Sequence, residues 1–167
     1  MTSARALLRW QFQLAHELLD GAIGPLSAEA VRRRPPGAAA RAAACYAQVL
    51  WCEDLSVNGG LVAGKPLALS TWVGRTGLSE LPPLAGATDW QAWARRVQLD
   101  LARLRPYAGA VHASTDAYLA GLPDEAFEPP AECLLTALLL TLSMRRGEIT
   151  CLLGHSSSPS PSPAAPC

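Results

Sequence analysis

The stretch ECLLTALLLTLSMRRGEITCLLG, residues 132–154, is the longest uninterrupted helical pattern in the chain. Pro129 and Pro130 stand just before it, where proline suits a helix start. Gly154 follows the last apolar pair, where a C-cap glycine belongs. At about 100° per residue, one broad face collects the aliphatic side chains of Leu134, Leu135, Leu138, Leu139, Leu142, Ile149, Leu152 and Leu153. The pattern predicts a long amphipathic helix that buries this face.

Three further stretches carry apolar residues at intervals of three or four positions, as amphipathic helices do. They cover residues 3–20, 38–58 and 90–122. No part of the chain indicates a strand. Four helices of this length predict an all-α fold, and more finely a four-helix bundle, formed by one domain at residues 1–154.

Glycine and proline mark the expected breaks between these helices. Residues 59–88 are rich in both and show no sustained period, which predicts a long Gly/Pro-rich loop between the second and third long helices. Pro106 is expected to kink or split the third helix near Arg105. Residues 155–167 repeat serine and proline with little apolar content, which predicts a disordered Ser/Pro-rich tail.

The amino-acid composition limits the kinds of molecule that we expect the protein to bind. The chain has 167 residues, of which 50% are hydrophobic, so it can bury a core. Its 14 basic and 14 acidic residues cancel, which argues against nucleic acid or an anionic membrane as the main partner. The most apolar run, residues 133–144, is well short of the about 20 residues that span a bilayer. No signal peptide is visible, so we expect a cytoplasmic protein.

Cysteine usage points to a reducing compartment. The five cysteines show no CxxC spacing and no regular framework, and their number is odd. Cys45 and Cys52 lie about 10 Å apart along one predicted helix, which is too far for a disulfide. We therefore expect reduced thiols that are mostly buried.

Three phrases occur in an order that is typical of one superfamily. The first is YAQVLWCED at residues 46–54, followed by a Gly-rich loop with GKP at residues 64–66. The second is YLAGLPDEAFEPP at residues 118–130, a link after a long helix. The third is TLSMRRGEITCLLG at residues 141–154, which has the spacing of a signature with two histidines four apart, then glycine and an acid or amide. Together they resemble the DinB-like (DinB/YfiT) superfamily across the ordered part of the chain.

The resemblance implies a four-helix bundle that is commonly a homodimer. Many members hold a divalent metal with three histidines, one from the second long helix and two from the last. Characterised relatives include thiol-dependent transferases and isomerases that use bacillithiol or mycothiol. In those proteins the metal would activate a thiol or a water molecule by lowering its pKa.

Carried over position by position, the three metal-ligand histidines fall on Gln48, Thr141 and Arg145. All three are replaced, although Gly147 and Glu148 match the signature. The guanidinium of Arg145 is a fixed cation that cannot coordinate a metal. We therefore expect the family's metal site to be absent.

The replaced positions define a candidate pocket between the second long helix and the last. One interpretation is a remnant site in which Arg145 takes the role of the metal charge and binds a ligand with a carboxylate or thiolate. The other interpretation, which we favour, is that Arg145 pairs with Glu148 or Glu53 and only fills space inside the bundle. The candidate pocket residues are Gln48, Cys52, Thr141, Arg145 and Glu148.

Two other groups are weaker candidates for chemistry. Cys52 is one helical turn beyond Gln48 and could supply a nucleophilic thiolate, but cysteine is more often an inert core residue. His16 and His112 could form a displaced metal site if their helices meet at the same level. Neither has a second ligand at helical spacing, so we favour ordinary helix-face histidines.

Two functional hypotheses remain. The first is a DinB-like protein of unassigned activity, metal-free and either non-catalytic or binding a small ligand. The second is a divergent metal- or thiol-dependent transferase or hydrolase, which would use Arg145 or a divalent metal such as zinc or nickel at a displaced site. In both cases the resemblance and the apolar excess predict a homodimer.

Overall fold

The computed structural model describes residues 3–32, 37–83, 89–123 and 129–154. These residues are mostly helical and form no strand, apart from one isolated bridge between Leu78 and Leu99. The predicted all-α class is therefore confirmed. The expected tail at residues 155–167 lies outside the described residues. Within the described ranges, no helix is both long and apolar enough to cross a membrane.

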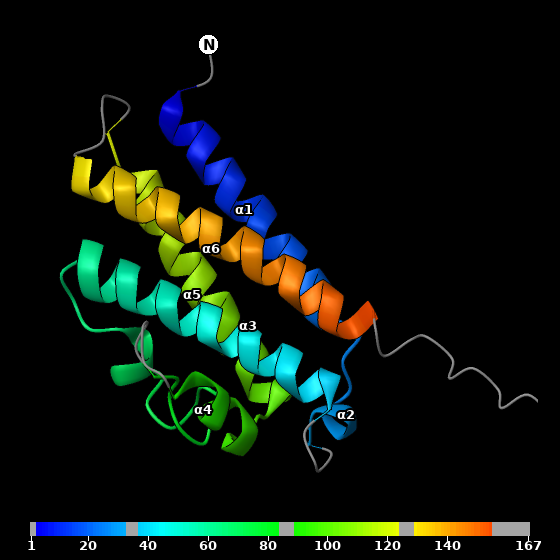
Figure 1. Cartoon of the computed structure of the whole chain (residues 1–167). Helices are drawn as coiled ribbons and strands as arrows, with labels where there is room; N and C mark the ends of the chain where they lie inside the picture. Colours follow the sequence, from blue (N-terminus) through cyan, green and yellow to red (C-terminus); the bar gives the residue numbers. More distant parts are fainter. Residues whose placement is uncertain (1–2, 33–36, 84–88, 124–128, 155–167) are drawn as a thin grey trace, which may run out of the picture.

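Four long helices and two short ones make up the described chain. The longest, α6, packs against α1 and α3, and α5 packs against the same two helices from another side (Figure 1). The short helix α2 lies against α3, as does α4. Their bounds are Ala4–Ile23 (α1), Ala28–Arg32 (α2), Ala38–Asp54 (α3), Trp90–Arg96 (α4), Leu101–Gly121 (α5) and Pro129–Gly154 (α6).

The core forms around α3, which is buried along almost its whole length. Its run of alanines, among them Ala43 and Ala47 with 0% exposure, lets neighbouring helices approach closely. The leucine-rich face of α6 is buried as predicted, with Leu135, Leu142 and Ile149 at most 1% exposed. Burying each such side chain stabilises the fold by about 1.5–3 kcal/mol.

The end of α3 differs from the prediction. We expected a helix through residue 58 and a loop from residue 59, but α3 ends at Asp54 and a π-helical segment, Leu55–Leu61, continues the chain. A 3₁₀ turn at Leu67–Leu69 follows. The Asp54 carboxylate accepts hydrogen bonds from the backbone N–H groups of Leu67 and Ala68, at 2.7 and 2.9 Å, and so ties the start of the loop to the end of α3.

The third predicted helix is also divided, but not at Pro106. That proline stays inside α5, and the chain is instead extended between α4 and α5, at residues 97–100. The Asp100 side chain caps α5 by accepting a hydrogen bond from the backbone of Ala102 at 3.0 Å. Val97 and Leu99 are buried while their neighbours are exposed, an alternation with the period of extended chain. This local pattern explains why the break precedes the proline.

Candidate functional site

A cavity of about 400 Å³ lies between α3 and α6. Four of the five candidate residues line this α3–α6 cavity: Gln48 and Cys52 from α3, and Thr141 and Arg145 from α6. Its apolar wall includes Leu134 and Leu138, among other side chains. Its size is that of a site for a small molecule.

The fifth candidate, Glu148, lines a neighbouring cavity with Cys45 and Trp90. Arg145 connects the two cavities, because its Nη1 lies 2.5 Å from Glu148 Oε2 and its guanidinium lies 5.9 Å from the centre of the Trp90 ring. Of the two partners expected for Arg145, Glu148 is the one observed. Glu53 instead contacts His16.

The α3–α6 cavity does not fit the three-histidine metal centre of the resembling family. A guanidinium occupies one ligand position, and it is held there by a carboxylate and an aromatic ring. Because guanidinium has five N–H donors and no lone pair to give, it would repel a divalent ion instead of binding it. Any ligand at this place must therefore be compatible with a fixed positive charge.

Two buried polar atoms of residues that line the α3–α6 cavity have no hydrogen-bond partner among the described residues. They are Gln48 Oε1, an acceptor, and Trp51 Nε1, a donor, and both residues line the cavity. A buried polar atom left without a partner costs about 1–3 kcal/mol. Both atoms are covered by neighbouring protein atoms, so a ligand can bond to them only after the lining side chains shift, whereas Arg145 lines the cavity with a cation.

The thiols at these cavities are poor nucleophiles. Burial raises the pKa of Cys52, and the nearby charge of Arg145 opposes this only in part. Burial, followed by the charge of Glu148, raises the pKa of Cys45 to about 12. Since the thiolate is the reactive form, neither side chain is activated for attack near neutral pH.

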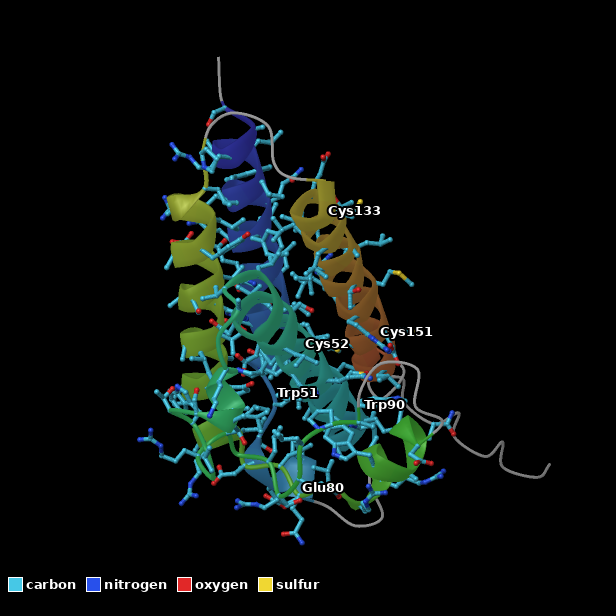
Figure 2. All side chains as sticks on the ribbon, turned by 90° about the vertical axis from the view of Figure 1, so that its left-hand side faces the viewer. Trp51, Cys52, Glu80, Trp90, Cys133 and Cys151 are labelled. Atoms are coloured by element: carbon cyan, nitrogen blue, oxygen red, sulfur yellow. The ribbon has the colours of Figure 1, made fainter. Side chains whose placement is uncertain are left out.

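Not all cysteines are buried as we expected. Cys133 and Cys151 are exposed along α6, whereas Cys52 lies on α3 (Figure 2). The sequence pattern misled here because both positions lie outside the leucine-rich face. None of the four cysteines among the described residues forms a disulfide.

A second polar site lies between α1, α3 and α5. His16, Glu53 and His112 meet there, and one ligand atom from each lies within 4.8 Å of the other two. His16 Nε2 is 2.9 Å from Glu53 Oε1, and the two imidazole rings stack with centroids 3.8 Å apart. His16 is 7% exposed and is therefore not the ordinary helix-face residue that we favoured.

The cluster holds an ionised carboxylate inside the protein. Burial by itself raises the pKa of Glu53, but the hydrogen bond and charge of His16, the charge of His112 and the hydrogen bond from Thr115 together hold it below its usual value. Burial, followed by repulsion from His16, lowers the pKa of His112. These shifts favour the ionised form of Glu53 and the neutral form of His112.

Sequence reasoning missed Glu53 as the meeting point of the two histidines. The available signal was a pair of acids, Glu53 and Asp54, on a helix whose other residues are mostly apolar. Both carboxylates have 0% exposure. Buried acids require specific partners, so their position pointed to a polar centre without revealing its other members.

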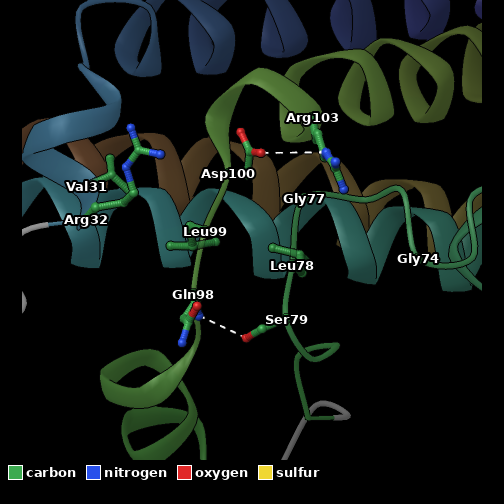
Figure 3. Close-up of a pocket in the computed structure, with 10 residues that line it drawn as sticks. All are labelled: Val31, Arg32, Gly74, Gly77, Leu78, Ser79, Gln98, Leu99, Asp100 and Arg103. Atoms are coloured by element: carbon green, nitrogen blue, oxygen red, sulfur yellow. Dashed lines mark hydrogen bonds and ion pairs between the residues drawn. The ribbon is translucent and has the colours of Figure 1, made fainter.

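A third cavity, of about 480 Å³, lies where the loop after α3 meets the start of α5 (Figure 3). Gly77, at φ +81°, packs so closely that an added Cβ would lie 2.5 Å from the carbonyl oxygen of Asp100. The charged residues at this cavity, such as Asp100 and Arg103, form an exposed pair 3.7 Å apart. Among the described residues, none that lines this cavity has a buried side-chain atom without a hydrogen-bond partner. We therefore interpret this region as a structural contact between the loop and the start of α5.

Comparison of the chain with family models, with curated proteins and with solved structures finds no match.

Proposed function

We propose that the chain is a small-ligand-binding protein of the DinB-like four-helix-bundle class, without a metal or catalysis at the α3–α6 cavity. The observation that carries the proposal is the pair of unpartnered buried atoms, Gln48 Oε1 and Trp51 Nε1, in a cavity that also presents Arg145. The order of the three sequence phrases supports the class. The four long helices are compatible with it.

The ligand expected here is a small anion with an apolar body and one further polar group. A carboxylate would bind the Arg145 guanidinium, whose five N–H donors can serve Glu148 and a ligand together. A hydroxyl group can donate to Gln48 and accept from Trp51. The leucines of the cavity wall would cover the apolar part of the molecule.

Three matched compounds test this proposal. We expect 4-hydroxyphenylacetate to bind saturably, and phenylacetate and 4-hydroxyphenylacetamide to bind more weakly because each lacks one polar group. Replacing Arg145 with glutamine should weaken the binding of 4-hydroxyphenylacetate by about 10- to 100-fold, since a charged hydrogen bond is lost. Isothermal titration calorimetry measures each affinity.

The matched control is Arg146→Gln, because Arg146 is the exposed neighbour on α6 and lines no part of the cavity. This variant should bind like the wild type. Equal affinities in the Arg145→Gln and Arg146→Gln variants, or no saturable binding of any of the three compounds, would contradict the proposal.

We also propose a homodimer, with its interface at exposed apolar side chains of α1 and α6. Leu7, Trp10, Leu14 and Leu18 recur at helical spacing along α1 and are 38–57% exposed. Met144, on the adjacent α6, is 67% exposed. A row of large apolar side chains on one helix is typical of an interface with another protein surface.

Sedimentation equilibrium at micromolar concentration tests the dimer. The wild type should sediment as a dimer, and Leu14→Glu as a monomer, because a charge would be buried without a partner. Gln91→Glu adds the same charge to an exposed position of α4 and should remain dimeric. A strictly monomeric wild type would rule out this interface.

We also propose a cytoplasmic location, because the five cysteines are odd in number and show neither CxxC spacing nor a regular disulfide framework. Recovery of the protein with secreted proteins on cell fractionation would contradict this assignment.

A further inference from the structure

The cluster of His16, Glu53 and His112 has the composition of a transition-metal site. Two imidazoles and one carboxylate come from three different helices, α1, α3 and α5, and each places a ligand atom within 4.8 Å of the other two. We propose that these residues bind one divalent transition-metal ion, and that zinc fits the ligand set best. Nitrogen ligands favour such ions over magnesium or calcium, which prefer oxygen alone. The proposal does not depend on the ligand proposed for the α3–α6 cavity.

The ring of His112 is oriented as in a metal ligand with a supporting carboxylate. Its Nε2 is buried and has no hydrogen-bond partner in the part of the chain that the structure describes. Its Nδ1 lies 3.6 Å from Asp20 Oδ2, and the Tyr46 hydroxyl donates a hydrogen bond to the same carboxylate. A metal-binding histidine usually points its other ring nitrogen at a carboxylate, which fixes the tautomer. With the proton on Nδ1, on the side of Asp20, the Nε2 lone pair would be available to the ion.

Glu53 is supported in the same way. Its Oε1 accepts a hydrogen bond from the Thr115 hydroxyl at 2.5 Å, which orients the carboxylate towards the two histidines. Both residues have 0% exposure, so this charge must be balanced inside the protein. In the metal-free state the nearest group to this carboxylate on α1 is the His16 ring, whose Nε2 lies 2.9 Å from Oε1. A divalent ion bound at this place would supply the balancing positive charge.

Binding requires one local movement. The His16 and His112 rings are nearly parallel, with 7° between their planes, so their lone pairs do not converge on one point. Zinc bonds of about 2.0–2.2 Å require such convergence. One of the two rings must therefore turn before both can bind the same ion. Asp20, whose carboxylate faces His112, also lines a cavity of about 270 Å³ together with Tyr46 and Arg105.

Three protein ligands leave at least one coordination position for water or another small molecule. The site therefore differs from a closed structural zinc site with four protein ligands. It also differs from the expected site of the resembling family, because it shares no residue with the positions of Gln48, Thr141 and Arg145.

Metal analysis of the untagged, full-length protein tests the proposal. The protein is stripped with a chelator, incubated separately with Zn²⁺, Co²⁺, Ni²⁺ and Mn²⁺, passed through a desalting column and analysed by mass spectrometry. We expect about one zinc per chain, and visible absorption from bound Co²⁺ as an independent sign of coordination. Zinc at a hundredfold excess over its Kd should raise the Tm by about 5–10 °C.

Variants assign the ligands. His112→Gln removes a nitrogen that makes no hydrogen bond, so it should fold normally and lose at least about tenfold in zinc affinity. His155→Gln, at the third histidine of the chain, should bind like the wild type. Arg145→Gln should also retain zinc, which separates this site from the ligand proposed for the other cavity.

Two results would overturn the proposal. One is a wild-type protein that retains none of the four ions. The other is a His112→Gln variant that binds zinc as tightly as the wild type. If Glu53→Gln remains folded by circular dichroism, it must also lose zinc, and full binding by that variant would count against the site in the same way.

Discussion

Replacing Asp54 with alanine is expected to lower the free energy of unfolding by about 3–5 kcal/mol. The Asp54 carboxylate has 0% exposure and accepts four hydrogen bonds. The donors are Asn58 Nδ2 and the Tyr107 hydroxyl, each at 2.9 Å, and the backbone N–H groups of Leu67 and Ala68. Alanine would leave these donors without an acceptor and detach the loop from α3 and α5. A loss of this size is a large share of the about 5–15 kcal/mol that stabilises a typical domain.

Urea unfolding followed by circular dichroism measures this effect. Asp54→Asn keeps the shape of the side chain but replaces one acceptor with a donor that faces other donors. Its free energy of unfolding should therefore lie between those of the Asp54→Ala variant and the wild type. The control is Asp116→Ala, at a carboxylate near the surface that pairs with Arg9 and Gln13. Its effect should be much smaller, because exposed ion pairs contribute little. An Asp54→Ala variant as stable as the control would show that the buried carboxylate does not hold the loop.

The helical class could be predicted because the apolar pattern and the core coincide. On α6, residues at helical spacing such as Leu135, Leu142 and Ile149 are the buried ones. A periodic pattern reports which face of a helix is covered, and this information is local. The same reasoning located the long helices, although not all of their ends.

The errors arose where a local signal competed with tertiary contacts. Pro106 was expected to break the third helix, but the break came earlier, at Val97 and Leu99, whose burial stabilises extended chain. Similarly, Gly59 was expected to end the second long helix and start a loop, but α3 ends at Asp54 and a π-helical segment continues past the glycine. The partners of Asp54 lie up to 53 residues away in the sequence, so no local pattern contains them.

The two candidate sites differ in how many of their residues could be predicted from the sequence. The resemblance supplied Gln48, Thr141 and Arg145 as a group, and the structure places all three on one cavity. His16 and His112 required knowledge of how α1 and α5 are aligned along their axes. Sequence spacing within one helix carries no information on that alignment, which depends on packing between helices. The proximity of both histidines to Glu53 could therefore be recognised only in the three-dimensional structure.

Restoring the three histidines of the resembling family is expected to create a metal site in the α3–α6 cavity. The variant combines Gln48→His, Thr141→His and Arg145→His. Thr141 and Arg145 are four positions apart on α6 and all three positions line one cavity, so the new imidazoles can reach a common ion. Removing Arg145 also removes the charge that repels it. The variant should bind one more Zn²⁺ or Ni²⁺ per chain than the wild type, with a rise in Tm of about 5–10 °C at a hundredfold excess over Kd.

The decisive control is the double variant Gln48→His and Thr141→His, which retains Arg145. It has two of the three ligands but keeps the guanidinium paired with Glu148, so it should gain no additional ion. Mass spectrometry of the three proteins after the same metal incubation compares the bound ions directly. If the triple variant folds and gains no ion, the three positions do not converge as the resemblance requires, and the DinB-like assignment loses its main support. If the triple variant alone gains an ion, the resemblance holds in three dimensions and Arg145 is the residue that excludes the metal from the natural protein.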